Sequence, residues 1–397
     1  MIERITIKNF KSFKDVSLKL GPLNIFIGAN ASGKSNFFDA LRVLQGIGYG
    51  FTLSEILDGK PKSATSEVWE GIRGGSTQVP FTSEDASKPT SFQVAGRLPN
   101  GGDNSFEFTI AFSAKVGLFG EEHLSVSGGP TYDAEAQRYH HPMIPSGVSY
   151  YNQKRDVAFP EVDEDHPVLT QIPGDDRRIE QLVRILANMQ RIDPSPALLR
   201  AYSQAFKIRR MGEHGENFAA LIRMICDNDE TKRAYLSWLR ELRPHDVDDV
   251  GIREGALGEP MVVMKERGRE WLAPVLSEGT LRFAAIAAAF FQPDMPGILT
   301  IEEIENGIHA SRLRLLVELL RSRAAAGKTQ IMVTTHSPIV LAWLKPEEYA
   351  TTFYCRRDKE TGESQIRPLT EIPRFNEIMS KQPISDLFAE GWMETAL

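Results

Sequence analysis

The segment Gly28–Asn36, which reads GANASGKSN, is the most specific motif in this sequence. It follows an apolar run, PLNIFI, and precedes FFDALRVL, whose apolar residues have helical spacing. Gly28 and Gly33 let the backbone wrap so that successive N–H groups point at phosphate oxygens, and the helix N-terminus adds partial positive charge. We therefore predict a nucleoside triphosphate site, with Lys34 on the β- and γ-phosphates and the Ser35 hydroxyl on Mg²⁺.

Composition describes a globular protein of two or three lobes. The chain has 397 residues, of which 41% are hydrophobic and 25% charged, and it contains no apolar run long enough to cross a membrane. Its alternating, charged N-terminus is not that of a signal or transit peptide. Cys226 and Cys355 lack metal-ligand spacing, so we expect buried thiols in a cytoplasmic protein. The net charge of −7 leaves room for DNA contact only through a local basic patch.

The periodicity changes several times along the chain. Strands are predicted for IERITIK, DVSLKL and PLNIFIG, followed by the loop, a helix over 36–44 and an antiparallel β lobe to about Pro160. Helical patterns follow in IEQLVRILANM, ALLRAYSQAFKIRR, FAALIRMIC and TKRAYLSWLRELR, with a proline break at 193–196. Strand-like GILTIEE, QIMVTT and YATTFYC then return, with a helix between the first two. We divide the chain into 1–160, 161–255 and 256–397: an α/β core from both ends with an inserted helical lobe.

A second group of reactive residues follows the GILTIEE strand. Glu302 is placed to hold Mg²⁺ and Glu303 to polarise the attacking water, because side chains alternate along a strand. A solvated acidic loop is the alternative, and Glu305 is the next candidate base. His336 ends the QIMVTT strand, where it would contact the γ-phosphate; a purely structural histidine is its alternative.

The segment LSEGT opens another helix and offers a second anion site. Ser277 and Gly279 lie at its start, where a hydroxyl, backbone amides and a helix N-terminus coincide. Capping of the helix by Ser277 explains the pattern equally well. As an anion site, this surface would complete the nucleotide site of another subunit.

Taken together, the four motifs resemble those of the ABC-type ATPases of the SMC, RecF and OLD (overcoming lysogenization defect) group. GANASGKSN looks like their Walker A motif, LSEGT like the signature, ILTIEEIENGIH like Walker B with the D-loop, and TTHSP like the switch histidine. The likeness is nearest to short bacterial "AAA family ATPase" proteins found in phage-defence and DNA-repair loci. It implies an α/β fold, an ABC-type P-loop ATPase head with a β lobe, a mostly parallel core and an inserted helical lobe.

The resemblance also implies roles for individual residues. Ser277 and Gly279 would contact the γ-phosphate of ATP on the opposite subunit, Glu303 would be the catalytic carboxylate and His336 the switch. Lys11 is either near the nucleotide or solvated, and Gln171 and Gln153 are the candidates for the family's Q-loop glutamine. Glu302 stands where the family usually has Asp, which affects the expected turnover rate. The residues implied around the triphosphate are Asn30, Ala31, Ser32, Gly33, Lys34, Ser35 and Asn36.

Two functions compete. The first is an ATPase whose subunits sandwich ATP–Mg²⁺ and couple its hydrolysis to assembly changes, as a homodimer or higher homo-oligomer working with a separately encoded nuclease or toxin effector. The second is an ATP-gated sensor or scaffold with little hydrolysis that holds such an effector. A transporter ATPase subunit is disfavoured by the N-terminal pattern and the long insertions. A nuclease within this chain is disfavoured because residues 336–397 lack an acidic cluster.

Overall fold

The computed structural model describes residues 1–60, 69–81, 88–99, 104–127, 131–134, 148–152, 155–159, 163–171, 177–204, 208–242 and 247–395. The chain forms two compact units, and each takes several separate segments. The first unit comprises Met1–Gly21, Ile27–Met189 and Thr351–Glu371. The second unit comprises Pro22–Phe26, Gln190–Ala350 and Ile372–Leu397. The division into 1–160, 161–255 and 256–397 stays a prediction.

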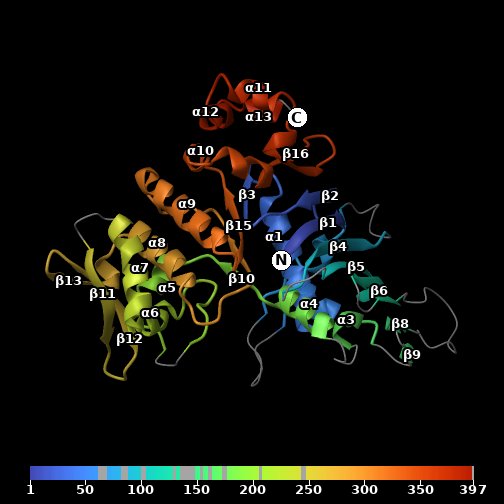
Figure 1. Ribbon diagram of the computed structural model, residues 1–397, viewed down its shortest axis with the longest axis horizontal. Helices are drawn as coiled ribbons and strands as arrows, with labels where there is room; N and C mark the ends of the chain where they lie inside the picture. The colour runs from blue at the N-terminus through green and yellow to red at the C-terminus, as the bar shows by residue number, and fades with distance from the viewer. Residues whose placement is uncertain are drawn as a thin grey trace. The chain divides into compact units, whose positions relative to one another are not determined.

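An antiparallel sheet of eight strands, drawn in blue to green in Figure 1, belongs to the first unit. Its alternating strands bury one face, as in β4, where buried and half-buried residues alternate. Phe92 stacks on Phe112 with ring centroids 5.8 Å apart and meets Phe10 edge-on at 5.2 Å, which forms the lobe's core. The strand order is β2 (Phe13–Lys19), β1 (Ile2–Phe10), β4 (Thr90–Arg97), β5 (Ser105–Ser113), β6 (Leu118–Val126), β7 (Thr131–Ala134), β8 (Val148–Asn152) and β9 (Arg155–Phe159).

Helix α1 (Lys34–Tyr49) is the main helix of the first unit. It ends where Gly50 adopts a left-handed conformation and its N–H reaches the carbonyls of Gly46 and Ile47. Helix α4 (Arg177–Ala187) lies beside α1 so closely that a Cβ on Gly48 would come within 2.4 Å of the Ala187 nitrogen. The remaining elements of this unit are α2 (Leu53–Asp58), η1 (Ser76–Gln78), α3 (Val168–Gln171), the hairpin β16 (Thr352–Arg357) with β17 (Ser364–Pro368), and η5 (Leu369–Glu371).

The second unit contains strands in the order β10 (Met189–Ile192), β14 (Ile298–Ile301), β15 (Gln330–Thr335) and β3 (Leu23–Ile27). Strands β14 and β15 are parallel and every residue in them is buried, as expected for strands covered on both faces. Helix α9 (Ala310–Ala325) connects them. The prediction of an α/β fold with an antiparallel β lobe is therefore confirmed.

A helical layer lies beside a small antiparallel sheet in the second unit (Figure 1). Helix α8 (Glu278–Ala289) is buried almost all round, and the Tyr235 hydroxyl donates to its Ala284 carbonyl at 2.9 Å. The other elements are α5 (Pro196–Leu199), α6 (Phe218–Cys226), α7 (Asp229–Leu242), β11 (Val247–Glu254), β12 (Pro260–Glu266), β13 (Arg269–Leu272), η3 (Ala273–Val275), α10 (Pro338–Leu341), η4 (Pro346–Thr351), α11 (Phe375–Met379), α12 (Ile384–Ala389) and α13 (Trp392–Thr395).

Two expectations about the helical region are wrong. The run ALLRAYSQAFKIRR was predicted as helical, but among its described residues only 197–199 lie in a helix, α5, and the Ser203 N–H instead bonds the Pro260 carbonyl. Met189, assigned to the end of a helix, begins β10, which pairs with the buried strand β14. The three-stranded sheet β11–β13 was not anticipated at all. No helix in the described ranges is long and apolar enough to cross a membrane.

Candidate functional site

The loop between β3 and α1 can be built only with glycine at its two ends. Gly28 has φ of +150°, and a Cβ there would lie 2.2 Å from the Cys355 carbonyl oxygen. Gly33 has φ of +105°, and its Cβ would meet the Ser364 side chain at 2.6 Å. Both neighbours belong to the β16–β17 hairpin of the same unit. The β16–β17 hairpin therefore packs so closely on the loop that neither Gly28 nor Gly33 can be replaced by a residue with a side chain.

Lys34 closes this loop from inside. Its side chain is buried, and Nζ donates to the carbonyls of Gly28 at 2.7 Å and Ala29 at 2.8 Å. The Ser32 hydroxyl is also buried and makes no hydrogen bond within the described residues. A fixed ammonium group, an unsatisfied hydroxyl and the first turn of a 16-residue helix converge here. This donor set fits a phosphate group.

The other predicted loop residues are arranged around that centre. Asn30 and Ala31 are exposed, and Ala31 adopts a left-handed φ of +62°. Asn36 Nδ2 donates to the Ser12 hydroxyl at 2.7 Å, which ties α1 to the β1–β2 turn. Ser35 is half-buried on the first turn of α1. The seven predicted phosphate-site residues thus form one continuous segment of the first unit.

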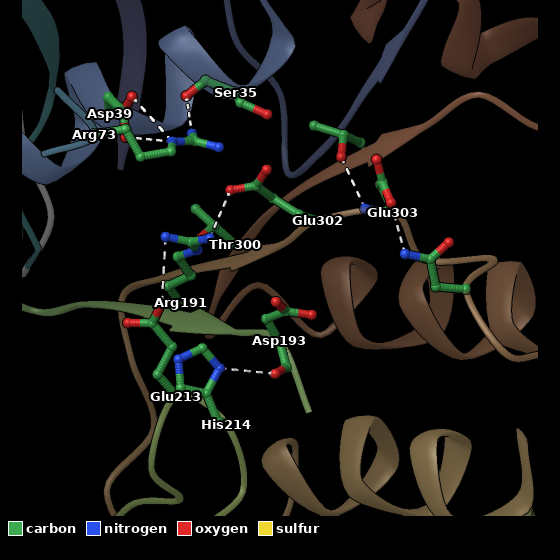
Figure 2. A network of polar contacts seen from close by, with 12 residues as sticks. Ser35, Asp39, Arg73, Arg191, Asp193, Glu213, His214, Thr300, Glu302 and Glu303 are labelled. Atoms are coloured by element: carbon green, nitrogen blue, oxygen red, sulfur yellow. Dashed lines mark hydrogen bonds and ion pairs between the residues drawn. The ribbon is translucent and has the colours of Figure 1, made fainter. Parts of the chain in front are cut away.

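Lys11 is neither solvated nor free to reach a ligand. Its Nζ lies 2.5 Å from Asp39 Oδ2 and donates to the Arg73 carbonyl at 2.6 Å, with the side chain 7% exposed. Burial lowers the pKa of Lys11, and the Asp39 carboxylate opposes that shift. Arg73 bonds Asp39 at 3.2 Å and donates to the Ser35 carbonyl at 2.5 Å (Figure 2). This network, which sequence reasoning missed, fixes the start of α1.

The carboxylates after β14 have distinct partners in the second unit. Glu303 has a left-handed φ of +46°, which is uncommon for a residue with a side chain. Its N–H donates to Thr334 Oγ1 at 2.9 Å, and its Oε2 accepts a hydrogen bond from Asn306 at 2.6 Å (Figure 2). The strained backbone and the amide together give this carboxylate a defined direction.

Glu302 is held by an arginine that sequence reasoning did not identify. Its Oε1 lies 3.1 Å from Arg191 Nη2, and Arg191 Nη1 lies 3.3 Å from Glu213 Oε1 (Figure 2). Arg191 lies on β10, the strand whose first residue, Met189, was assigned to the end of a helix. No sequence pattern marks Arg191 as a partner of Glu302, because basic residues are common near the end of an amphipathic helix pattern.

His336 and Glu305 form a third pair in the second unit. Glu305 Oε1 accepts the backbone N–H of His336 at 2.7 Å and lies 3.1 Å from its ring Nδ1. The Glu305 side chain is 9% exposed and that of His336 is 43% exposed. His336, the candidate switch residue, is therefore paired with Glu305, the alternative candidate for the catalytic base.

The start of α8 borders a cavity of about 670 Å³ in the second unit. Ser277 caps the helix by accepting the Thr280 N–H at 3.2 Å. A Cβ on Gly279 would lie 2.4 Å from the Gly307 carbonyl, so the helix start packs directly on the turn after the acidic segment. The cavity is lined by Leu242, Ser277, Glu278, Gly279, Thr280, Gly307, Ile308, His309, Ser311 and Arg312.

The remaining candidates have structural roles or lie outside the described residues. The side-chain amide of Gln171 stabilises the turn before it. It donates to the carbonyls of Asp163 at 2.8 Å and His166 at 3.1 Å and accepts the Asp163 N–H. Gln153 lies outside the described residues. Cys355 is buried, which raises the pKa of its thiol to about 12, whereas Cys226 is only half-buried.

Comparisons with known proteins agree with this chemistry. Residues 229–342 match a family model described as "AAA domain, putative AbiEii toxin, Type IV TA system", and residues 1–60 match one described as "AAA ATPase domain". The chain is 24% identical over 354 residues to a Helicobacter pylori "ATP/GTP phosphatase", with 85% of each chain covered. The predicted resemblance to AAA-type ATPases and the prediction of an ATP-hydrolysing enzyme are confirmed: the chain carries an ATPase domain.

Solved structures of low sequence identity are also similar. The SMC head domain of Thermotoga maritima has a TM-score of 0.44 at 14% identity, with 92% of this chain and 98% of that chain covered. The Smc head domain of Pyrococcus furiosus, bound to the C-terminal domain of ScpA, has a TM-score of 0.48 at 14% identity, with 96% and 99% covered.

Proposed function

We propose that this ATPase binds ATP–Mg²⁺ between two copies of the chain, hydrolyses it, and couples binding and hydrolysis to changes of assembly. The observation that carries the proposal is the closed loop of the first unit. Its buried ammonium group rests on backbone carbonyls that a triphosphate would replace with stronger, charge-assisted contacts.

The first unit supplies the phosphate site. Lys34 binds the β- and γ-phosphates, and the loop amides from Asn30 to Gly33 bind phosphate oxygens, while Asn36 ties the start of α1 to the β1–β2 turn. Mg²⁺, when bound, neutralises the charge that develops on the transferred phosphoryl group. The Ser35 hydroxyl and Glu302 would hold it together with phosphate oxygens, an arrangement that suits a cation that keeps several waters.

The second unit supplies the hydrolytic groups. Glu303 orients and polarises the attacking water, and its direction is set by the Asn306 hydrogen bond. His336 contacts the γ-phosphate through the exposed edge of its ring. Ser277 and the N–H of Gly279, at the mouth of the cavity beside α8, contact the γ-phosphate bound by the other copy.

The biological setting that we propose is bacterial defence or DNA maintenance with a separately encoded nuclease or toxin effector. Support comes from the matching family model, whose description names a toxin system. In this setting the γ-phosphate acts as the link between two copies. Its loss would remove the contacts that Ser277 and Gly279 make with the other copy and release the assembly.

An ATP-gated scaffold with slow turnover is the second candidate. The Arg191–Glu302 ion pair favours it, because the carboxylate must weaken that pair before it can hold a water of Mg²⁺. A steady-state rate far below one turnover per minute, with ATP-dependent dimerisation intact, would select this candidate.

Mixing two inactive variants tests the shared site. Lys34→Ala removes the cation on the phosphates, and Ser277→Arg blocks the opposing surface. In a mixed dimer one composite site carries both lesions and the other carries none, so ATP hydrolysis should return. The matched control is Ser322→Arg, an exposed serine on α9, which should hydrolyse ATP like wild type. Mixed dimers that form but stay inactive at every ratio would contradict independently acting shared sites.

A further inference from the structure

Glu305 makes an unusual double contact with His336. One oxygen, Oε1, accepts the backbone N–H at 2.7 Å and lies 3.1 Å from the ring Nδ1. The backbone bond fixes the position of the residue, and the ring contact fixes how its side chain is turned. A single carboxylate oxygen therefore controls both the place and the orientation of His336.

The chemistry of this contact determines which ring nitrogen faces outward. A carboxylate oxygen accepts hydrogen bonds, so its position 3.1 Å from Nδ1 favours the tautomer that carries the proton on Nδ1. Nε2 is then the nitrogen left to meet a ligand. The exposed fractions of the two side chains agree with an outward-facing Nε2, because the Glu305 side chain is 9% exposed and the His336 side chain is 43% exposed.

The same carboxylate is poorly suited to act as a base. Oε1 already accepts the backbone N–H of His336 and lies 3.1 Å from its ring Nδ1, and Oε2 is buried without a hydrogen-bond partner among the described residues. Glu303, in contrast, has its direction set by an amide and a left-handed backbone. The two carboxylates, two residues apart, have different tasks.

We propose that Glu305 is a positioning residue that holds His336 with Nε2 outward and ties it to the turn that carries Glu303. The turn is short and internally bonded, from Asn306 N–H to the Glu303 carbonyl at 2.9 Å and from Ile308 N–H to the Glu305 carbonyl at 3.0 Å. A displacement of this turn therefore moves the water-polarising carboxylate and the phosphate-sensing histidine together. This inference rests on the proposed role of His336.

Double-mutant kinetics test the coupling. Glu305→Ala should lower kcat by about tenfold, the scale of one charged hydrogen bond, and should leave KM for ATP nearly unchanged because the phosphate loop remains intact. In the His336→Ala background the same change should have no further effect. Glu305→Gln keeps an acceptor oxygen and should recover most of the rate. Equal losses in both backgrounds would overturn the proposal, because Glu305 would then act independently of His336.

A second measurement does not depend on hydrolysis. Long-range ¹H–¹⁵N spectra of the imidazoles, with His336 assigned from the His336→Gln variant, should show a proton on Nδ1 in the wild type and its loss in Glu305→Ala. The matched control is Glu318→Ala, an exposed carboxylate on α9, which should leave the His336 signals unchanged. If His336→Ala hydrolyses ATP normally, the proposed role of His336 fails. Unchanged His336 signals in Glu305→Ala would instead overturn the positioning role.

Discussion

At the scale of single residues, Gly28 has no room for a side chain. Gly28→Ala would force a Cβ against the Cys355 carbonyl in a backbone conformation that L-residues avoid. We expect a destabilisation on the order of 1–3 kcal/mol in urea unfolding and loss of ATP binding in a fluorescent-nucleotide titration. Gly251→Ala is the control: a Cβ there would meet no atom within 4 Å, so both properties should stay near wild type. Normal ATP binding by Gly28→Ala would show that the loop relaxes into another shape.

Glu303 is the residue on which the hydrolytic step is proposed to depend. Glu303→Gln keeps the side-chain size but cannot polarise water as a carboxylate does. Turnover should fall by about 10²–10⁴-fold while ATP affinity is retained, so ATP should accumulate on a closed assembly. Phosphate release and nucleotide titration on one preparation separate the two effects. Turnover at the wild-type rate would exclude Glu303 as the base.

Candidate residues that belong to a local motif could be proposed from the sequence, whereas contacts between residues distant in the sequence could not. Lys34 and Glu303 could be proposed because spacing relative to a strand and a helix is visible in the sequence. Arg191 and Glu305 were missed as partners because their contacts, with Glu302 and His336, depend on which strands lie beside each other. No one-dimensional pattern encodes that adjacency.

At the scale of elements, α8 is joined to the acidic turn by one buried guanidinium group. Arg282 donates to the carbonyls of Pro194 at 3.0 Å and Glu302 at 3.3 Å and pairs with Asp193 at 3.2 Å. Arg282→Met should cost about 2–5 kcal/mol in urea unfolding, because it leaves buried acceptors unpaired. It should also slow hydrolysis by loosening the turn.

The control for this prediction is Arg253→Met, which removes an exposed ion pair with Glu270. It should change stability by no more than about 1 kcal/mol. Equal effects of the two substitutions would show that the buried position of Arg282 contributes nothing beyond a surface charge.

Elements with strong periodicity were predicted well, and short or irregular ones were not. The N-terminal strands, the helix after the loop and the β14–α9–β15 unit follow clear patterns of buried residues. Strand β10 has only four residues and continues the apolar spacing of α4, so its sequence fits a helix. After Leu199, tertiary hydrogen bonds such as Ser203 N–H to Pro260 carbonyl outweigh the helical spacing.

At the scale of the whole molecule, net charge limits binding to DNA. With a net charge of −7, any contact must come from a local patch. We expect a dissociation constant of about 1 μM or higher at physiological salt. The affinity should fall steeply as the salt concentration rises from about 50 to 200 mM. Fluorescence anisotropy of a labelled duplex measures both, with and without ATP. Tight binding that persists at high salt would contradict this expectation.

The discontinuous make-up of the two units has a consequence for synthesis on the ribosome. The phosphate loop is translated early, yet Cys355 and Ser364, which shape it, are added more than 300 residues later. Both units also take segments from beyond residue 350. Neither unit can therefore complete its fold before the segments beyond residue 350 have been synthesised, and until then the nascent protein stays partly folded. A chain ending at residue 350 should fail to bind ATP although it contains every residue predicted to do so.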